Sequence, residues 1–249
     1  MSGDSWAAGV ADPTERGTMQ YGGITECLHN YGYEVRNLAK PGGSNLQSCE
    51  ILKNYLSFNA TEISKIKCIF FWQTEFFREL WFYKEKPRDD EFKNSYSILK
   101  DLWIYRPYYR LAEISQSCNI PIYIIGGCSD TVWFDNFEKD FPGVKIVCQS
   151  FTNLLLNRSH RIDNPIFCEF IFGGALPGGW TDEFLKQVKK GISNKDLEIL
   201  NNDIDLGHQR TQQFESNMDF FGPDGLHPNS HAQEILFEFL LEKIPNLRR

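Results

Sequence analysis

The strongest constraint on the fold is an alternation of short apolar runs with amphipathic stretches. The runs lie at residues 33–38, 67–72, 121–126 and 144–149, and most of them are almost continuously apolar. Strands that are buried on both faces of a parallel sheet have this composition, because helices cover both sides of such a sheet. The alternation therefore predicts a single α/β domain over residues 1–249 with a mainly parallel sheet.

Amphipathic stretches between the runs predict helices at 19–30, 45–57 and 95–118. Pro107 falls inside the third stretch and predicts a kink or a break there, because proline removes a helical hydrogen bond. Residues 151–215 fit the alternation poorly. We expect them to form an insertion over the carboxyl ends of the strands, where α/β proteins place their sites.

Two further helices are predicted near the carboxyl terminus. One should begin after Thr181, a possible N-cap followed by two acidic residues, and should end near Gly191. The other has the clearest pattern: Ser230 and Gln233 form a capping-box pair, and apolar residues then repeat at helical spacing. Pro245 should end this last helix.

Charge and cysteine content exclude several classes of function. The net charge of −7 and the pI near 5.3 give no electrostatic basis for binding nucleic acids or anionic membranes. Seven cysteines without any C-x-x-C pair predict free, mostly buried thiols and no metal site. No signal peptide or membrane-length apolar run is present, and the cysteines are expected to be free, so we expect a cytoplasmic protein.

Residues suited to acyl transfer lie at the two ends of the chain. Ser5 stands in G-D-S-W, and Asp224 and His227 stand in P-D-G-L-H-P just before the last predicted helix. A serine nucleophile needs a base to take its proton and a carboxylate to orient that base. The spacing of Asp224 and His227 allows the carboxylate to face one imidazole nitrogen while the other nitrogen faces the site. Ser5 comes from the opposite end of the chain, so only the fold can bring it to His227.

A second D-x-x-H, formed by Asp205 and His208, shows how weak this spacing is alone. It lies in a polar stretch with no predicted strand or cap beside it. Asp224 and His227 are preferred because a turn and a helix start surround them, and His208 is read as an ordinary surface residue.

Taken together, these motifs resemble the SGNH (GDSL-type) hydrolase superfamily, and in particular a subset found in tailed phages. The first block matches Gly3-Asp4-Ser5, the second matches Asn37 followed by Gly42, and the last matches Asp224 and His227. The resemblance implies a three-layer α/β/α sandwich with a doubly wound, flavodoxin-like sheet. It also implies Ser5, His227 and Asp224 as the triad, with the amides of Ser5 and Gly42 in the oxyanion hole. No metal or organic cofactor is implied by it.

Two features depart from the family pattern. The third block, usually G-x-N-D, is replaced by W-Q-T-E, which leaves Thr74 or Gln73 as the side-chain donor to the oxyanion. Losing one such donor typically costs about 10²–10³ in rate. The family also has a central strand before its G-D-S, whereas only Met1 and Ser2 precede Gly3 here. We expect either that the natural reading frame begins upstream or that another segment fills the gap.

The expected function is therefore hydrolysis of an ester by a serine hydrolase, with O-acyl groups of a carbohydrate as one candidate substrate. The alternative is a catalytically weak or inactive relative that serves as a binding or virion-associated module. A third interpretation is an unrelated flavodoxin-like domain in which G-D-S is accidental. The aromatic run at 70–83 is expected to be mostly core, although it could line a substrate groove.

Overall fold

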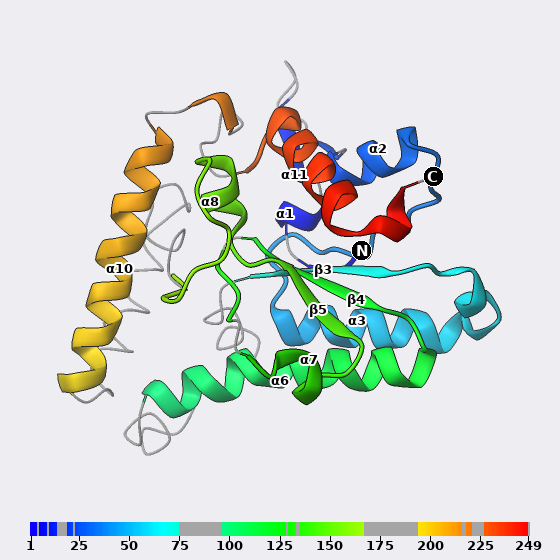
Figure 1. The fold of residues 1–249 in the computed structure, drawn as a ribbon, viewed down its shortest axis with the longest axis horizontal. Helices are drawn as coiled ribbons and strands as arrows, with labels where there is room; N and C mark the ends of the chain where they lie inside the picture. Colours follow the sequence, from blue (N-terminus) through cyan, green and yellow to red (C-terminus); the bar gives the residue numbers. More distant parts are fainter. Residues whose placement is uncertain are drawn as a thin grey trace.

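The computed structural model of the protein describes residues 1–3, 5–8, 10–13, 19–21, 23–74, 96–127, 129–132, 135–166, 194–215, 218–220 and 227–248. Figure 1 shows helices packed around a small central sheet. The strands are β1 (Val10–Pro13), β2 (Met19–Tyr21), β3 (Ile69–Gln73), β4 (Ile122–Gly126) and β5 (Val144–Cys148). The α-helices are α1 (Ser5–Ala8), α2 (Gly23–Asn30), α3 (Asn45–Phe58), α6 (Tyr96–Cys118), α7 (Phe137–Asp140), α8 (Phe151–Leu155), α10 (Asn194–Glu215) and α11 (Ser230–Lys243). Short 3₁₀ helices are η1 (Ala60–Lys65), η2 (Met218–Phe220) and η3 (Pro245–Leu247).

Three parallel strands form the central sheet in the order β3-β4-β5. Ile69 pairs with Ile122, and Ile122 in turn pairs with Val144. β1 and β2 form a separate antiparallel pair. The predicted strands at 67–72, 121–126 and 144–149 are thus confirmed to within two residues, and the fold is mixed α/β with a parallel sheet. Continuous apolar runs identified these strands because both of their faces are buried.

The first residues of the chain pair with the free edge of β3. Ser2 forms a parallel bridge with Phe71. Its amide donates to the carbonyl of Phe70 at 2.9 Å, and the amide of Trp72 donates to the carbonyl of Ser2 at 3.0 Å. These are the two bonds that a parallel ladder makes around one paired residue. Residues 1–3 therefore continue the sheet beyond β3.

A second extended segment lies on the other side of residues 1–3. The amide of Leu38 donates to the carbonyl of Met1 at 2.8 Å, and the amide of Lys40 donates to that of Gly3 at 3.0 Å. The predicted strand at 33–38 is wrong, since residues 33–40 form no regular strand. Only the part next to Met1 and Gly3 makes ladder-like bonds, because the short segment 1–3 offers no longer partner.

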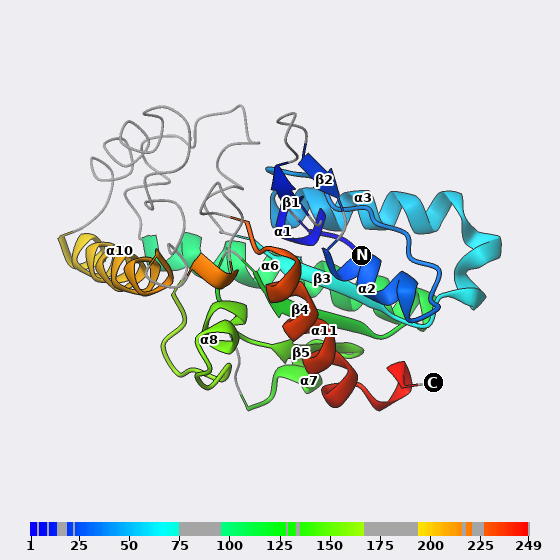
Figure 2. The same cartoon turned by 90° about the horizontal axis from the view of Figure 1, so that it is seen from above.

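Helices cover both faces of the sheet (Figures 1 and 2). On one face, α3, α6 and α7 pack against alternate strand residues such as Phe71 and Ile124. On the other face, α1, α2, α8 and α11 pack against Phe70, Trp72 and Ile125. Neighbouring residues of β3 thus enter opposite cores, as strand geometry requires. Each fully buried side chain of this kind contributes about 1.5–3 kcal/mol.

Two predicted helices differ from the structure in informative ways. The stretch at 19–30 divides into β2 and α2, and only its second part is helical. Pro107 lies inside α6 without interrupting it, so a break at this residue is wrong, whereas the alternative, a kink, stays a prediction. Pro107 is buried, and its neighbours Tyr108 and Leu111 are fully buried in the core. This packing outweighs the hydrogen bond that proline removes, which costs about 3 kcal/mol in a helix interior.

The last helix begins one residue earlier than predicted, because its cap is the residue before Ser230. Asn229 is the N-cap, and its side chain accepts from the amide of Ala232 at 3.0 Å, whereas Ser230 is already helical. Asparagine and serine are equally good caps, so sequence alone did not separate them. The helix ends at Lys243, and Pro245 opens η3, as predicted.

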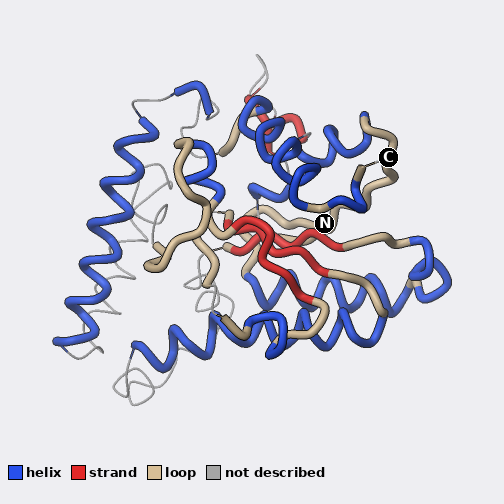
Figure 3. The backbone as a smooth tube through the Cα atoms, viewed as in Figure 1, coloured by secondary structure: helices blue, strands red, loops and turns tan. Residues whose placement is uncertain are grey.

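The segment from 151 to 215 contributes two described helices, α8 and α10. α10 runs along one side of the molecule, away from the sheet (Figure 3). The polar stretch around Asp205 is therefore helical, and Asp205 itself is exposed. The helix expected between Thr181 and Gly191 lies outside the described residues, and so does the side chain of His208.

Gly3 occupies a position that only glycine fits well. Its φ is +147°, and an added Cβ would lie 2.8 Å from the Cβ atoms of both Ala7 and Trp72. Gly42 also has a positive φ, +72°, but nothing lies within 4 Å of the place where its Cβ would be. A side chain at Gly3 would therefore meet both backbone strain and steric overlap, whereas one at Gly42 would meet backbone strain alone.

We expect Gly3→Ala to destabilise the protein by about 3 kcal/mol or more, because strain and overlap with backbone-anchored atoms add together. Gly42→Ala should cost about 1 kcal/mol, because it adds strain alone. Urea unfolding of both variants measures the difference. Equal losses of stability in the two variants would contradict the close contact of Gly3 with Trp72.

Candidate active site

The turn after residues 1–3 places the backbone of Ser5 at the carboxyl edge of the sheet. Ser5 is the first residue of α1, two residues beyond Gly3, and α1 contacts β3. Helix α3 anchors this part of the chain, since the hydroxyl of Ser48 donates to the carbonyl of Gly3 at 3.2 Å. The hydroxyl of Ser2 donates back to the carbonyl of Ser48 at 2.9 Å. Only the backbone of Ser5 belongs to the described part of the chain.

The loop that carries Gly42 lies beside this turn. The side-chain amide of Asn37 donates to the carbonyls of Ala7 and Ala8, each at 3.3 Å, so it ties the loop to the end of α1. Its oxygen accepts from the amide of Ala39 at 3.0 Å, which starts the turn. Gly42 then takes up its positive φ at the surface, with open space beside it. The exposed position of Gly42 leaves this part of the loop accessible to a bound ligand.

Thr74 follows β3 and is held by Asn45, the first residue of α3. The Asn45 side chain accepts from the Thr74 amide at 2.9 Å and donates to the Thr74 carbonyl at 2.8 Å. The hydroxyl of Ser129 donates to the same carbonyl at 3.2 Å. All three side chains are buried. Asn45 thus completes the backbone bonding of Thr74 as a neighbouring strand would, and fixes this residue at the sheet edge.

Gln73 has a different environment from the one expected of an oxyanion donor. Its side-chain oxygen accepts from the hydroxyl of Tyr108, and its amide nitrogen donates to the carbonyl of Asp130 at 3.0 Å. Burial raises the pKa of Tyr108, so this hydroxyl stays protonated as a donor. These contacts favour a structural role for Gln73 and leave Thr74 as the better placed of the two candidates.

His227 lies at the start of the segment that leads into α11. It is partly buried, and Asn229 two residues later caps the helix. The Asn229 amide also donates to the carbonyl of Phe220 at 2.9 Å, which anchors the entry to the helix. Ala232 in the first turn of α11 and Ala7 of α1 belong to the same buried cluster. The helices next to Ser5 and His227 therefore pack on the same face of the sheet (Figure 2).

The structure thus brings several predicted residues to one edge and leaves one untested. The backbone of Ser5, the Gly42 loop and Thr74 all lie at the carboxyl ends of residues 1–3 and β3. His227 lies three residues before α11, which packs on the same face of the sheet as α1. Asp224 lies outside the described residues, so its contact with His227 stays a prediction.

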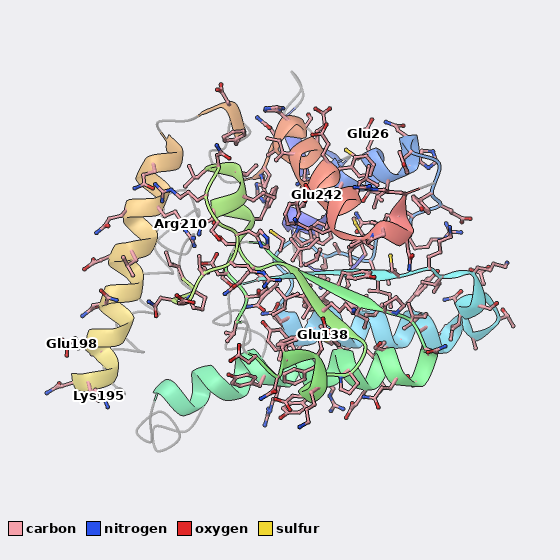
Figure 4. The ribbon with its side chains drawn as sticks, viewed as in Figure 1. Glu26, Glu138, Lys195, Glu198, Arg210 and Glu242 are labelled. Atoms are coloured by element: carbon pink, nitrogen blue, oxygen red, sulfur yellow. The ribbon has the colours of Figure 1, made fainter. Side chains whose placement is uncertain are left out.

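Sequence reasoning missed a buried ion pair at the same edge of the sheet. Arg210 of α10 donates to Asp130 at 2.7 Å, and their side chains are only 5% and 1% exposed. The guanidinium also donates to Asn153 at 3.0 Å and to Ser150 at 3.2 Å, both in the region after β5. Asp130 accepts in addition from the amide of Ile166 at 2.8 Å. Arg210 thus joins α10 to the loops after β4 and β5 (Figure 4).

A signal for Asp130 was present, since it follows β4 by only a few residues, where parallel sheets collect functional and polar groups. No comparable signal existed for Arg210. It lies in a helix of polar composition, and nothing in the sequence distinguishes it from a surface arginine.

The state of the cysteines, possible metal sites and possible membrane helices can be compared with the sequence analysis over the described residues. Cys27, Cys49, Cys68, Cys118 and Cys148 are free thiols, as predicted, whereas Cys128 and Cys168 are outside this set. Over the same part of the chain, no cluster of three His, Cys, Asp or Glu side chains could hold a metal ion. None of the described helices combines the length and apolarity needed to cross a membrane.

No family model, no curated protein and no solved structure matches the chain.

The ion pair gives a stability prediction. Arg210→Met should cost about 3–5 kcal/mol, because it leaves the buried carboxylate of Asp130 without its counter-charge. The double variant Asp130→Asn/Arg210→Met should recover part of this loss. Arg110→Met is the control, since Arg110 pairs with Glu113 at the surface and its loss should cost less than about 1 kcal/mol. Chemical denaturation measures all three. Equal effects of the Arg210 and Arg110 variants would show that α10 is not anchored by this pair.

Proposed function

We propose that the chain is an SGNH-type serine hydrolase with a three-layer α/β/α sandwich and a doubly wound, flavodoxin-like sheet. The order of segments across the sheet supports this proposal. It runs from 36–40 through residues 1–3 to β3, β4 and β5. After residues 1–3, the chain adds the segment 36–40 on one side of them. It then crosses to the other side, where β3, β4 and β5 are added in order away from residues 1–3.

The reversal of direction is the single observation on which the proposal depends most. In open α/β sheets, ligands bind outside the carboxyl ends of the strands at the point where the strand order reverses. That point lies here between residues 1–3 and β3, where the Ser5 turn, the Gly42 loop and Thr74 meet. A serine at this position is well situated to act on a bound substrate.

In the proposed reaction, the Ser5 oxygen attacks the acyl carbon of an ester while His227 takes the hydroxyl proton. Asp224 orients His227 and stabilises its charged form. His227 then returns the proton to the leaving alcohol, and a serine ester of the acyl group remains. Water, activated by His227, attacks this ester and releases the acid together with free Ser5.

The negative charge on the tetrahedral intermediate needs donors that are already in place. The backbone amides of Ser5 and Gly42 supply two, and Thr74 is the candidate for the third. The surface exposure of Gly42, in the loop that pairs with Gly3, supports its role as a donor. The two hydrogen bonds between the Asn45 side chain and the backbone of Thr74 support a fixed position for the third donor.

The substrate class proposed is an ester, and O-acylated carbohydrates are the candidates to test first. A comparison of acetylated sugars with short-chain aryl esters separates a sugar esterase from a general one.

The second candidate function is a non-catalytic binding module with the same fold, such as a virion-associated protein. The engagement of Gln73 by Tyr108 and Asp130 favours it, because this amide then has no part in an oxyanion hole. If Thr74 also fails as a donor, only two backbone donors remain.

The two functions predict different reactivity toward a fluorophosphonate probe, which labels activated serines. We expect the native sequence to be labelled, and Ser5→Ala to lose labelling completely. His227→Ala should react about 10²–10⁴-fold more slowly, because it lacks the general base. Labelling rates are followed by gel fluorescence and intact mass.

Matched controls exist for both substitutions. Ser57 is an exposed serine of α3, and His231 is an exposed histidine in the first turn of α11. Ser57→Ala and His231→Ala should label like the unmodified protein. Well-folded protein that shows no labelling at Ser5 would reject the hydrolase in favour of the binding module.

A further inference from the structure

A pocket of about 230 Å³ lies between helix α10 and the segment that follows β5. One wall is a single side of α10, where Leu206, Gln209 and Arg210 lie three and four residues apart. The other wall is made of Asn153 in α8, Arg158 and the stretch 162–166. None of the described residues of the candidate site at Ser5 lines this pocket, so the two places are separate.

The buried ion pair of Arg210 holds the two walls together. Its guanidinium donates to Asp130 at 2.7 Å and to the side-chain oxygen of Asn153 at 3.0 Å (Figure 4). Asp130 neutralises the charge of Arg210. The contribution of Arg210 to the pocket is therefore to fix α10 and the Asn153 side chain in place.

Asn153 presents hydrogen-bond donors to the pocket. Its side chain is only 7% exposed, and its oxygen is fixed as the acceptor for Arg210. The other end of the same amide is a nitrogen with two N–H donors. This nitrogen makes no hydrogen bond within the described part of the chain. Because buried polar groups are normally bonded, it calls for an acceptor in the pocket that Asn153 lines.

Arg158 gives the pocket a positive charge. It is exposed, and over the described ranges no ion pair involves its guanidinium. No carboxylate is present among the described residues that line the pocket. A guanidinium keeps its charge at neutral pH and binds a carboxylate through two parallel N–H donors. In a chain with a net charge of −7, this pocket therefore favours an anion.

Apolar side chains line the pocket beside these polar groups. Ile162 and Ile166 come from the segment after α8, and Leu206 of α10 is 38% exposed although it is apolar. A surface of this kind packs against the C–H face of a sugar ring. The volume lies below the range of about 300–1,000 Å³ that drug-sized ligands occupy, which fits a single ring.

We propose that this pocket binds one acidic sugar unit, a monosaccharide ring that carries a carboxylate. Arg158 binds the carboxylate, and the nitrogen of Asn153 donates to a ring hydroxyl. The exposed amide of Gln209 bonds to a further hydroxyl, and Leu206 packs against the C–H face. The proposal does not rest on the hydrolase chemistry, because binding in this pocket requires no reaction at Ser5.

Calorimetric titration of the whole protein at pH 7 and low salt compares three probes: glucuronate, glucose and acetate. Glucuronate has both the ring and the charge, whereas glucose has only the ring and acetate only the charge. Glucuronate should bind at least about tenfold more tightly than either, because ring contacts and a bond to a charged group both contribute. No binding of glucuronate, or an equal affinity for glucuronate and either other probe, would overturn the proposal.

Two arginine variants test the role of the charge. Arg158→Gln should bind glucuronate at least about tenfold more weakly and leave the affinity for glucose unchanged. Arg161→Gln is the matched control, since Arg161 is exposed nearby but does not line the pocket. It should bind glucuronate like the unmodified protein. Equal losses in the two variants would show a general attraction to positive surface and would refute a specific pocket.

NMR locates the bound sugar. Glucuronate should shift backbone amide signals in 153–166 and 206–213, and shifts confined to other regions would contradict the assignment of the pocket. Ser5→Ala should bind glucuronate with unchanged affinity. This variant separates the two proposals, because it abolishes the hydrolase reaction without touching the pocket.

Discussion

The pairing of residues 1–3 between β3 and the segment at 36–40 is the constraint on which the remaining structure depends. Four backbone hydrogen bonds hold this short piece of chain from both sides. The Ser2 hydroxyl donates to the carbonyl of Ser48 and the Ser48 hydroxyl donates to that of Gly3, so both bonds attach this piece to α3. Gly3 also allows its close approach to Trp72. At about 1 kcal/mol net for each hydrogen bond, the attachment is small in energy. It nevertheless fixes where Ser5 begins α1 and where the order of the sheet reverses.

At the carboxyl edge of the sheet, buried polar side chains form hydrogen bonds with backbone and charged groups that have no partner in a strand ladder. Asn45 pairs with the backbone of Thr74, Gln73 bonds to Asp130, and Arg210 joins Asp130 to the region after β5. Each contact satisfies a group that would be costly to bury alone. The carboxyl edge is therefore polar and its buried groups are bonded, which is the physical basis for placing the candidate active site there.

Local sequence patterns predicted the parts of the fold that depend on local interactions. The apolar runs identified β3, β4 and β5, and helical spacing identified α3 and α11. The failures involve tertiary contacts that no local pattern contains. Packing around Pro107 keeps α6 continuous, and the segment at 33–38 lacks a partner long enough to make it a regular strand. The contact between Arg210 and Asp130 joins residues 80 positions apart, so only the folded chain reveals it. Of the candidate site, sequence motifs predicted Ser5, Gly42 and Thr74 at one edge, whereas the link of Asp224 to His227 stays a prediction.

An experimental structure of the protein after reaction with a small phosphonate ester tests the central claim most directly. The account predicts a covalent bond between phosphorus and the Ser5 oxygen, a phosphoryl oxygen within hydrogen-bond distance of the Gly42 amide, and the His227 ring beside the adduct. An unmodified Ser5, or a Ser5 side chain directed to the opposite face from His227, would contradict it.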